Sequence, residues 1–320
     1  MNDNALAAAI AAGDSVRGTT SPNPPVGAAI VSGDEIVGVG ATQPPGGPHA
    51  EVMALRQAGE RARGATAVVT LEPCNHTGRT GPCSRALIDA GINRVLYLNK
   101  DPFPQAAGGA DYLREHGVEV EFLDQRVEAL EPWLAATTLG RPHVTLKFAQ
   151  TLDGFTAAED GTSKWITGPE ARRHVHEDRQ LRDAVIVGTG TALADNPSLT
   201  ARDADGNLLA RQPRGVVIGR REVNASHLVQ FPDIDSALTQ LWEDGARDVL
   251  VEGGAGLAAS FLREDKVDAV RAYIAPLLLG SGLSTIGGGL ATTLAEAQRF
   301  SLVNHQQVGE DIVINLTRKA

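Results

Sequence analysis

Short apolar runs alternate with helical patterns along the whole chain, and this rhythm is typical of an α/β protein. In the first half we expect strands at 26–31, 35–39, 67–71, 94–98 and 118–122. The helices expected around them cover 6–16, 49–63, 84–90, 111–116 and 128–136. This alternation predicts a three-layer α/β/α domain.

The same rhythm continues after a short connector at Gly140-Arg141-Pro142. The second half predicts strands at 144–148, 184–187, 215–218, 249–251, 269–275 and 312–316, and helices at 169–182, 236–244 and 256–262. A chain of 320 residues also favours two domains over one, at about 150 residues per domain. We therefore expect domains at 1–142 and 143–320.

Composition narrows the class of protein. Hydrophobic residues make up 42% and charged residues 21%, which is ordinary for a folded domain. Residues 1–142 carry 11 basic and 16 acidic side chains and the rest carry 18 and 23, so neither half is a basic nucleic-acid module. No apolar run is long enough for a membrane span, and no basic signal-peptide region opens the chain, so we expect a cytoplasmic protein with no membrane partner. We also expect a homo-oligomer, of a size that the sequence does not reveal.

The two cysteines of the chain, Cys74 and Cys83, follow a His-Ala-Glu triplet that begins with His49. One imidazole and two thiolates are enough ligands for a catalytic Zn²⁺ with an open position for water. Glu51 then lies beside the metal and can carry a proton from water to a leaving amine, as in zinc deaminases. Taken singly, His49 could be a helix cap and the cysteines a buried pair or a disulfide. Their combination predicts the zinc site.

The segment from Cys74 to Cys83, Cys-Asn-His-Thr-Gly-Arg-Thr-Gly-Pro-Cys, resembles the deaminase domain of the bifunctional riboflavin-pathway deaminase/reductase family. Pro22-Asn23-Pro24-Pro25-Val26-Gly27 and Asp101-Pro102 resemble further elements of that family. The resemblance implies that His49, Cys74 and Cys83 hold Zn²⁺, that Glu51 is the catalytic proton shuttle, and that Asn23 and His76 contact the substrate. From the residues alone, Asn23 could be a turn former and His76 a loop cap. Met53, Gly81 and Phe103 depart from the family pattern, which leaves the substrate contacts open.

Glycine turns mark the second half. Gly188-Thr189-Gly190 and Gly253-Gly254-Ala255-Gly256 each follow a predicted strand, where exposed backbone N–H groups can hold a phosphate. Leu193 stands where the dinucleotide fingerprint needs a third glycine, so the first turn is no Rossmann motif. From the residues alone, ordinary tight turns of a parallel sheet are the more common explanation of both patterns.

Together with Val144–Gly154 and Ser163–Gly168, these turns resemble the reductase domain of the same family. The resemblance implies a dihydrofolate-reductase-like α/β fold that uses NADPH, behind a cytidine-deaminase-like α/β/α domain. It implies cofactor contacts at Ala149, Trp165, Thr191, Asp195, Gly253 and Gly254. It implies substrate contacts at Ser163, Arg179, Leu199, Arg202 and Glu252. The forked guanidinium groups of Arg179 and Arg202 suit a phosphate, although arginines more commonly form surface salt bridges. Trp165 could instead be a core residue.

The resemblance implies a hydrolase and an oxidoreductase in one chain. The hydrolase deaminates 2,5-diamino-6-(5-phosphoribosylamino)pyrimidin-4-one, and the oxidoreductase reduces the ribosyl chain of 5-amino-6-(5-phosphoribosylamino)uracil with NADPH. Lys147 and Asp195 are candidates for handling the proton of the reduction, unless Lys147 pairs with Asp153. Two alternatives stay open: a zinc deaminase of nucleobases or tRNA, and a non-catalytic protein with structural zinc. The acidic first half and the eight-residue spacing of the cysteines argue against the former.

Overall fold

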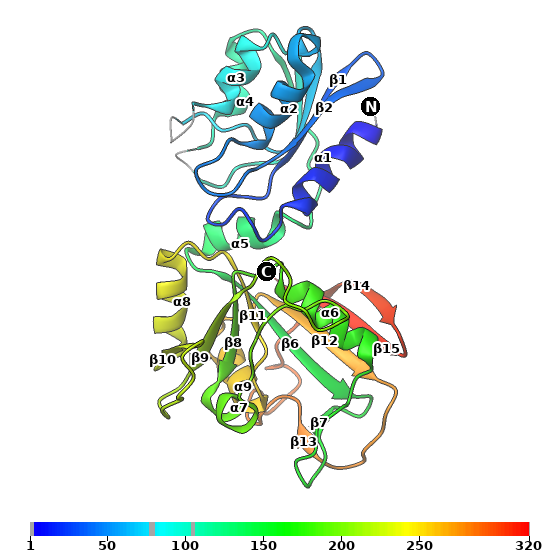
Figure 1. Cartoon of the computed structure of the whole chain (residues 1–320), viewed down its shortest axis with the longest axis vertical. Helices are drawn as coiled ribbons and strands as arrows, with labels where there is room; N and C mark the ends of the chain where they lie inside the picture. The colour runs from blue at the N-terminus through cyan, green and yellow to red at the C-terminus, as the bar shows by residue number, and fades with distance from the viewer. Residues whose placement is uncertain (1–2, 77–80, 104–105, 320) are drawn as a thin grey trace. The chain divides into compact units, whose positions relative to one another are not determined.

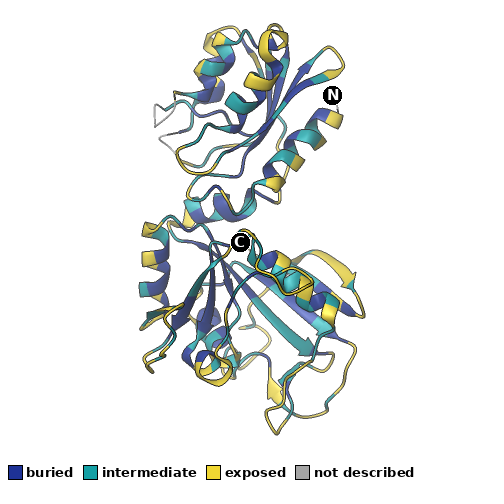
Figure 2. Cartoon of the chain, in the orientation of Figure 1, coloured by how far each residue is buried: buried dark blue, intermediate teal, exposed yellow. Residues whose placement is uncertain are grey.

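The computed structural model describes residues 3–76, 81–103 and 106–319, and the chain forms two compact units, Met1–Gly140 and Arg141–Ala320 (Figure 1). Each unit has its own buried core (Figure 2). Within the part of the chain that the structure describes, every helix is too short or too polar to cross a bilayer.

The first unit is built around a five-stranded sheet in the order β2-β1-β3-β4-β5. Its elements are α1 (Asp3–Ser15), β1 (Gly27–Ser32), β2 (Glu35–Ala41), α2 (Ala50–Ala58), the 3-10 helix η1 (Gly59–Ala62), β3 (Thr66–Leu71), α3 (Cys83–Asp89), β4 (Arg94–Asn99), α4 (Gly109–Glu115), β5 (Glu119–Phe122) and α5 (Glu131–Leu139). β1 pairs antiparallel with β2 and β3, whereas β3, β4 and β5 run parallel.

Two glycines show that helices cover both faces of this sheet. A Cβ on Gly27 would lie 1.9 Å from the carbonyl oxygen of Ala9 in α1, and one on Gly40 would lie 2.3 Å from that of Ala50 in α2. Gly40 pairs with Ala28, the neighbour of Gly27, so the two glycines face opposite sides of the sheet. The unit therefore has the expected three layers, and only glycine permits the close approach of each helix.

The second unit contains an eight-stranded sheet in the order β10-β9-β8-β11-β6-β12-β15-β14, and a small β13-β7 ribbon. Its elements are β6 (His143–Thr151), β7 (Phe155–Ala157), α6 (Pro169–Arg179), β8 (Ala184–Gly188), α7 (Thr189–Asp195), β9 (Arg214–Ile218), β10 (Val229–Phe231), α8 (Ile234–Glu243), β11 (Asp248–Val251), α9 (Ala255–Arg263), β12 (Ala269–Ala275), β13 (Leu283–Ser284), β14 (Phe300–Val308) and β15 (Asp311–Arg318). β15 and β14 are antiparallel to their neighbours, and the other six strands are parallel.

The central parallel strands are buried on both faces. Ile186 of β8 belongs to the core cluster that contains α8 and α9, whereas its neighbours Val185 and Val187 belong to the cluster that contains Ala192 of α7. This arrangement explains why β8 and β11 are continuous apolar runs in the sequence. It also brings the carboxyl ends of β6, β8, β9 and β11 to one edge of the sheet.

The structure confirms the α/β class and nearly all of the predicted helices and strands. The helix predicted at 49–63 ends at Ala58 and continues as η1, because Gly59 adopts a φ of 55°. Five elements were not predicted from the sequence: α7, β7, β10, β13 and β14. β14 was missed because it is a mostly exposed edge strand without an apolar alternation.

Candidate active sites

Three potential metal ligands meet in the first unit. The Nδ1 atom of His49 lies 3.2 Å from the Sγ atom of Cys83 and 3.6 Å from that of Cys74. All three donor atoms lie within 4.8 Å of one another, and both cysteines are buried and free. Two soft thiolates and an imidazole are a donor set that suits zinc. Among the described residues, no fourth His, Cys, Asp or Glu joins this group.

Local structure explains why these residues meet. His49 is the N-cap of α2, Cys83 is the first residue of α3, and Cys74 follows the end of β3. The backbone N–H of Cys83 donates a hydrogen bond to the Sγ atom of Cys74 over 3.5 Å. The amino ends of α2 and α3 therefore both face the cluster, where partial positive charge stabilises thiolates.

The two thiols interact directly, and their pKa values shift in opposite directions. A hydrogen bond from Cys83, together with one from His49, lowers the pKa of Cys74 to about 4 despite burial. The same interaction with Cys74, followed by burial, raises the pKa of Cys83. The site therefore holds an anionic sulfur even before a cation binds.

Glu51 lies in the first turn of α2, two residues after His49, and only 4% of its surface is exposed. Burial and then the Cys74 thiolate raise the pKa of its carboxyl to about 7, against the opposing effects of a backbone N–H, of His49 and of a hydrogen bond with Cys83. A carboxyl group with such a pKa can both accept and donate a proton near neutral pH.

Glu72 supports the metal loop from behind. Its Oε1 atom accepts hydrogen bonds from the backbone N–H groups of Gly108 (3.2 Å) and Ala110 (3.1 Å) at the start of α4. A Cβ on Gly109 would lie 1.7 Å from the carbonyl oxygen of Pro73, so α4 packs directly on the residue before Cys74. Glu72 was not predicted from the sequence, although its position directly before Pro73-Cys74 could have identified it as a support of the metal loop.

His76 and Asn23 lie in loops of the same unit. The Nδ1 atom of His76 is buried and has no hydrogen-bond partner among the described residues. Asn23 is half-buried, and its backbone N–H donates to the carbonyl of Thr20 in a turn. The Thr77–Thr80 part of the loop between the cysteines lies outside the described residues. Among the described residues nothing occupies the His76 nitrogen, so it is available to a ligand. Asn23 forms a turn, as one of the two interpretations of its sequence position predicts.

A cavity of about 420 Å³ opens in the second unit beside α6. Five of its charged lining residues are Lys147 of β6, Lys164, Arg172 and Arg179 of α6, and Asp195 of α7. Glu252 completes the set, so four cations face two carboxylates. The cavity is therefore positively charged within an acidic protein, which favours an anionic ligand.

Glu252 and Arg179 form the floor of this cavity. Arg179 donates from Nε to Oε1 of Glu252 over 2.7 Å and from Nη2 to Oε2 over 2.9 Å, and Lys147 Nζ lies 3.5 Å from Oε2. Burial opposes ionisation of Glu252, but Arg179 and Lys147 outweigh it and lower the pKa to about 2. Lys147 therefore pairs with Glu252 rather than with Asp153, which instead accepts from the backbone of Leu279.

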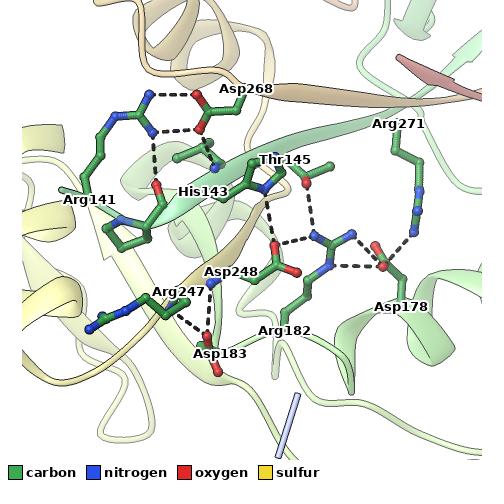
Figure 3. Close-up of polar contacts among 12 residues, drawn as sticks. Arg141, His143, Thr145, Asp178, Arg182, Asp183, Arg247, Asp248, Asp268 and Arg271 are labelled. Carbon is green, nitrogen blue, oxygen red and sulfur yellow. Dashed lines mark hydrogen bonds and ion pairs between the residues drawn. The ribbon is translucent and has the colours of Figure 1, made fainter. Parts of the chain in front are cut away.

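A buried ion network fixes α6 behind Arg179 (Figure 3). Arg182, whose side chain is 2% exposed, donates to Asp178 of α6 and to Asp248 of β11, both over 2.7 Å, and to Thr145 of β6 over 3.0 Å. Arg271 of β12 contacts the same oxygen of Asp178 over 2.6 Å. Asp178 is thus held directly by β12 and, through Arg182, by β6 and β11, so the next residue along the helix, Arg179, is held in place.

A second cavity, of about 680 Å³, lies where β8, β9 and β11 end. Gly188, Thr191, Asp195 and Gly254 line it, and Thr191 Oγ1 accepts a hydrogen bond from the N–H of Gly254 over 3.3 Å. Asp195 lines both cavities, so the two are neighbours. A crevice at the carboxyl ends of parallel strands is the usual place for a nucleotide.

The cavities contain most of the residues predicted for the second unit. Ala149, Trp165, Arg179, Leu199 and Glu252 line the smaller one. Trp165 is 68% exposed, with the Arg172 guanidinium 4.4 Å from its ring centre, so it is no core residue.

Gly253, Ser163 and Arg202 do not line either cavity. Gly253 packs against Leu257, where a Cβ would lie 2.6 Å from a methyl group, and Ser163 is exposed. Arg202 donates to Thr200 Oγ1 over 3.1 Å and to the carbonyl of Gly206 over 2.7 Å.

Two further residues of the smaller cavity, Arg172 and His176, were not predicted. His176 lies four residues after Arg172 and three before Arg179, so all three side chains lie on one face of α6. This helical spacing could have identified them from the sequence. No comparable signal identified Lys164, whose Nζ atom lies 3.5 Å from Asp195.

Comparison with known proteins agrees with both halves of this description. Residues 142–314 match the family described as RibD C-terminal domain, and residues 1–99 match the cytidine and deoxycytidylate deaminase zinc-binding region. The riboflavin biosynthesis protein RibD of Corynebacterium ammoniagenes is 58% identical over 92% of both chains. The chain belongs to the RibD family. The Escherichia coli RibD protein is 38% identical over 97% of this chain and 98% of its own.

Solved RibD structures have the same fold over the full length. Acinetobacter baumannii RibD has a TM-score of 0.88 at 36% identity and covers 100% of this chain and 99% of its own. A Thermotoga maritima protein, described as a diaminohydroxyphosphoribosylaminopyrimidine deaminase/5-amino-6-(5-phosphoribosylamino)uracil reductase, also has a TM-score of 0.88, at 33% identity over 99% of both chains. The expected family and its two-part α/β fold are therefore confirmed.

Proposed function

We propose that this RibD family member performs two consecutive reactions on one phosphorylated pyrimidine. The first unit deaminates 2,5-diamino-6-(5-phosphoribosylamino)pyrimidin-4-one, and the second reduces the ribosyl chain of the resulting uracil with NADPH. The observation that carries this proposal is the cluster of His49, Cys74 and Cys83 beside Glu51 in one unit, with a positively charged cavity next to a glycine-lined cavity in the other. We assign the deaminase to 1–142 and the reductase to 143–320.

In the deaminase, His49, Cys74 and Cys83 would hold Zn²⁺, which when bound supplies Lewis-acid activation of water. Glu51 accepts the proton of the attacking water and delivers it to the departing amine, so a C–O bond forms, the C–N bond breaks and ammonia leaves. The burial of Glu51 keeps bulk water from competing for that proton.

Substrate contacts in the deaminase are assigned to His76 and Asn23. The Nδ1 atom of His76 is buried and has no hydrogen-bond partner among the residues that the structure describes, which supports a polar contact with the substrate, because an unpaired buried nitrogen is costly. The amide of Asn23 offers both a donor and an acceptor to the pyrimidine edge.

In the reductase, we place NADPH in the larger cavity, with Thr191, Asp195, Gly253 and Gly254 around its phosphates and ribose. Gly254 is the N-cap of α9, and its exposed backbone suits a pyrophosphate. Ala149 and Trp165 lie in the neighbouring cavity, where the nicotinamide would meet the substrate. NADPH, when bound, supplies a hydride to C1 of the ring-opened ribosyl chain, and a proton from solvent completes the reduction.

We place the substrate phosphate in the smaller cavity, near Arg179, Leu199 and Glu252, with Ser163 and Arg202 assigned to the same substrate. The excess of cations there supports an anionic group. Because Glu252 is ionised and paired with Arg179, it positions that guanidinium, while Lys147 and Arg172 leave charge for the phosphate.

Product identification tests both reactions. The full-length chain is incubated with the diaminopyrimidinone phosphate, with and without NADPH, and the products are analysed by mass spectrometry. We expect the uracil and ammonia without NADPH, and the ribityl product with it. Glu51→Gln should abolish ammonia release while bound metal and the reduction of supplied uracil persist. Ammonia release by that variant would refute the role of Glu51. The cytoplasmic location and the homo-oligomeric state stay predictions.

A further inference from the structure

The cations that line the smaller cavity of the second unit already have partners within the protein. Arg172 donates from Nη1 to the carbonyl of Thr167 over 2.7 Å, and its guanidinium lies over the ring of Trp165. The other cations are in ion pairs: Lys147 and Arg179 with Glu252, and Lys164 with Asp195. An anion that enters this cavity therefore meets cations that also bind the protein, and it gains from any further cation.

His176 is the one histidine among the described residues that line this cavity, and it shares a face of α6 with Arg172 and Arg179. Its Nδ1 atom lies 3.0 Å from the carbonyl oxygen of Thr200. Because a carbonyl oxygen only accepts hydrogen bonds, Nδ1 carries a proton, and Nε2 of the neutral ring has a lone pair. Within the described residues, Nδ1 is the only ring nitrogen of His176 with a hydrogen-bond partner. The Nε2 atom is therefore available to a ligand.

The surroundings of His176 hold its ring in place and keep it neutral. The carbonyl of Thr200 also accepts from Arg179 Nη1 over 3.0 Å, so the imidazole and the guanidinium are fixed side by side. Burial and then the charge of Arg179 lower the pKa of His176, and Arg202 acts in the same direction, against the Thr200 hydrogen bond and the charge of Glu252. In the empty cavity at neutral pH, the ring is therefore uncharged.

We propose that His176 takes up a proton when the substrate phosphate enters the smaller cavity, and that its Nε2–H then donates to a phosphate oxygen. This inference rests on the proposed binding of that phosphate in the cavity. A phosphate with close to two negative charges favours the charged imidazole, whereas the empty, cationic cavity favours the neutral one. The new cation exists only while a phosphate is bound, so it favours the phosphorylated substrate over the unphosphorylated riboside.

Other described residues of the cavity do not offer this response. Lysine and arginine side chains already carry their protons at neutral pH. The two carboxylates, Asp195 and Glu252, face cations, which favour their ionised form. His176 is therefore the described lining residue that gains a proton most readily near pH 7.

The test titrates the full-length chain with ribose 5-phosphate in an isothermal titration calorimeter, in two buffers of different ionisation enthalpy. The difference in heat between the buffers gives the number of protons taken up. At about pH 7.5 the free phosphate has already lost its second proton, whose pKa is about 6, so the uptake belongs to the complex. We expect uptake of about 0.5 to 1 proton per chain, and binding that weakens up to about tenfold per pH unit as the pH rises. The KM for the uracil substrate in NADPH oxidation should rise with pH in the same way, while kcat stays nearly constant.

Two substitutions separate the charge from the hydrogen bonds. His176→Asn retains an amide N–H for the Thr200 carbonyl but has no titratable nitrogen, so it should bind ribose 5-phosphate roughly 10-fold more weakly and take up no proton. His176→Gln offers a neutral amide near the position of Nε2 and should recover part of the affinity, again without proton uptake. His174→Asn is the matched control, because His174 lies on the same helix but contacts the Tyr273 hydroxyl and does not line the cavity. It should change neither the affinity nor the proton uptake.

Each outcome decides. Binding of ribose 5-phosphate by the wild type without proton uptake would overturn the inference, as would a KM that does not depend on pH. Uptake that persists in both His176 variants, or that disappears in His174→Asn, would assign the proton to another group and overturn it as well. If the wild-type chain binds no ribose 5-phosphate and oxidises no NADPH with the uracil, the proposed reductase function itself fails, and the inference fails with it. That result is distinct from all of the others.

Discussion

The two units stabilise their charged side chains in opposite ways. In the first unit, three ligands and Glu51 come from two short motifs, and the thiolates depend on an incoming cation for charge balance. In the second unit, Glu252, Arg179 and Lys147 come from three distant parts of the chain and already pair with one another, with one positive charge left over. We therefore expect losses at the metal site to be complete, and losses at the reductase site to be graded.

The largest expected effect is that of Cys83→Ala. Removing one of three ligands should abolish stoichiometric zinc binding and reduce ammonia release by about 1,000-fold or more, because metal affinity and water activation both depend on the ligand set. Metal content by elemental analysis and ammonia release measure the two effects. The reduction of supplied uracil is the internal control and should stay unchanged. A variant that retains a full equivalent of zinc would contradict the three-ligand site.

Glu252→Gln tests the ion cluster of Glu252, Arg179 and Lys147 in the second unit. The ordinary pKa of 4.5 falls to about 2 in the folded state, so ionised Glu252 contributes on the order of 3 kcal/mol of stability. Because the folded pKa is the lower one, this contribution is complete above about pH 4.5 and disappears as the pH falls towards 2. The variant should unfold more easily in urea at pH 7, and its deficit should narrow at pH 3.

Reductase activity of Glu252→Gln should fall roughly 10- to 100-fold, since Arg179 loses its ionic partner. Ammonia release should not change. Glu243→Gln, on the exposed side of α8, is the control and should change neither quantity. A stability deficit of Glu252→Gln that does not depend on pH would show that Glu252 is not ionised in the folded protein.

Glu72→Ala tests how far the metal site depends on residues that touch no metal. Without its two hydrogen bonds to the start of α4, the loop before Cys74 should loosen, and zinc affinity should fall about 10-fold. Competition with a chelator measures the affinity. Glu72→Gln retains an acceptor oxygen and should recover most of it. Equal losses in both variants would show that charge, rather than the hydrogen bonds, matters at this position.

The cluster of His49, Cys74 and Cys83 could be predicted from sequence because its parts are local. His49, Glu51, Cys74 and Cys83 are fixed by the start of α2 and the β3–α3 loop, so residue type and spacing already specify the chemistry. Parallel strands such as β8 were equally clear, since burial on both faces leaves a continuous apolar run.

The reductase site could not be predicted in the same detail. Lys147 and Glu252 lie 105 positions apart, and only the register of β6 and β11 brings their side chains together. Charged residues on exposed turns, such as Arg221, look like surface residues until the strands place them over a cavity. Without the family resemblance, neither the Lys147–Glu252 ion pair nor the cavities of the second unit could be derived from local sequence patterns.

Arg202→Ala should have the smallest effect, because Arg202 contacts the site through another residue. It donates to Thr200 Oγ1, and the carbonyl of Thr200 accepts from Arg179 Nη1 over 3.0 Å. Its loss should raise the KM for the uracil substrate about 3- to 10-fold, with kcat and ammonia release nearly unchanged, since one hydrogen bond of the supporting chain is removed. Steady-state NADPH oxidation measures both constants. A loss as large as that in Glu252→Gln would mean that Arg202 binds the phosphate directly, and that the reductase site, like the metal site, has single residues that it cannot do without.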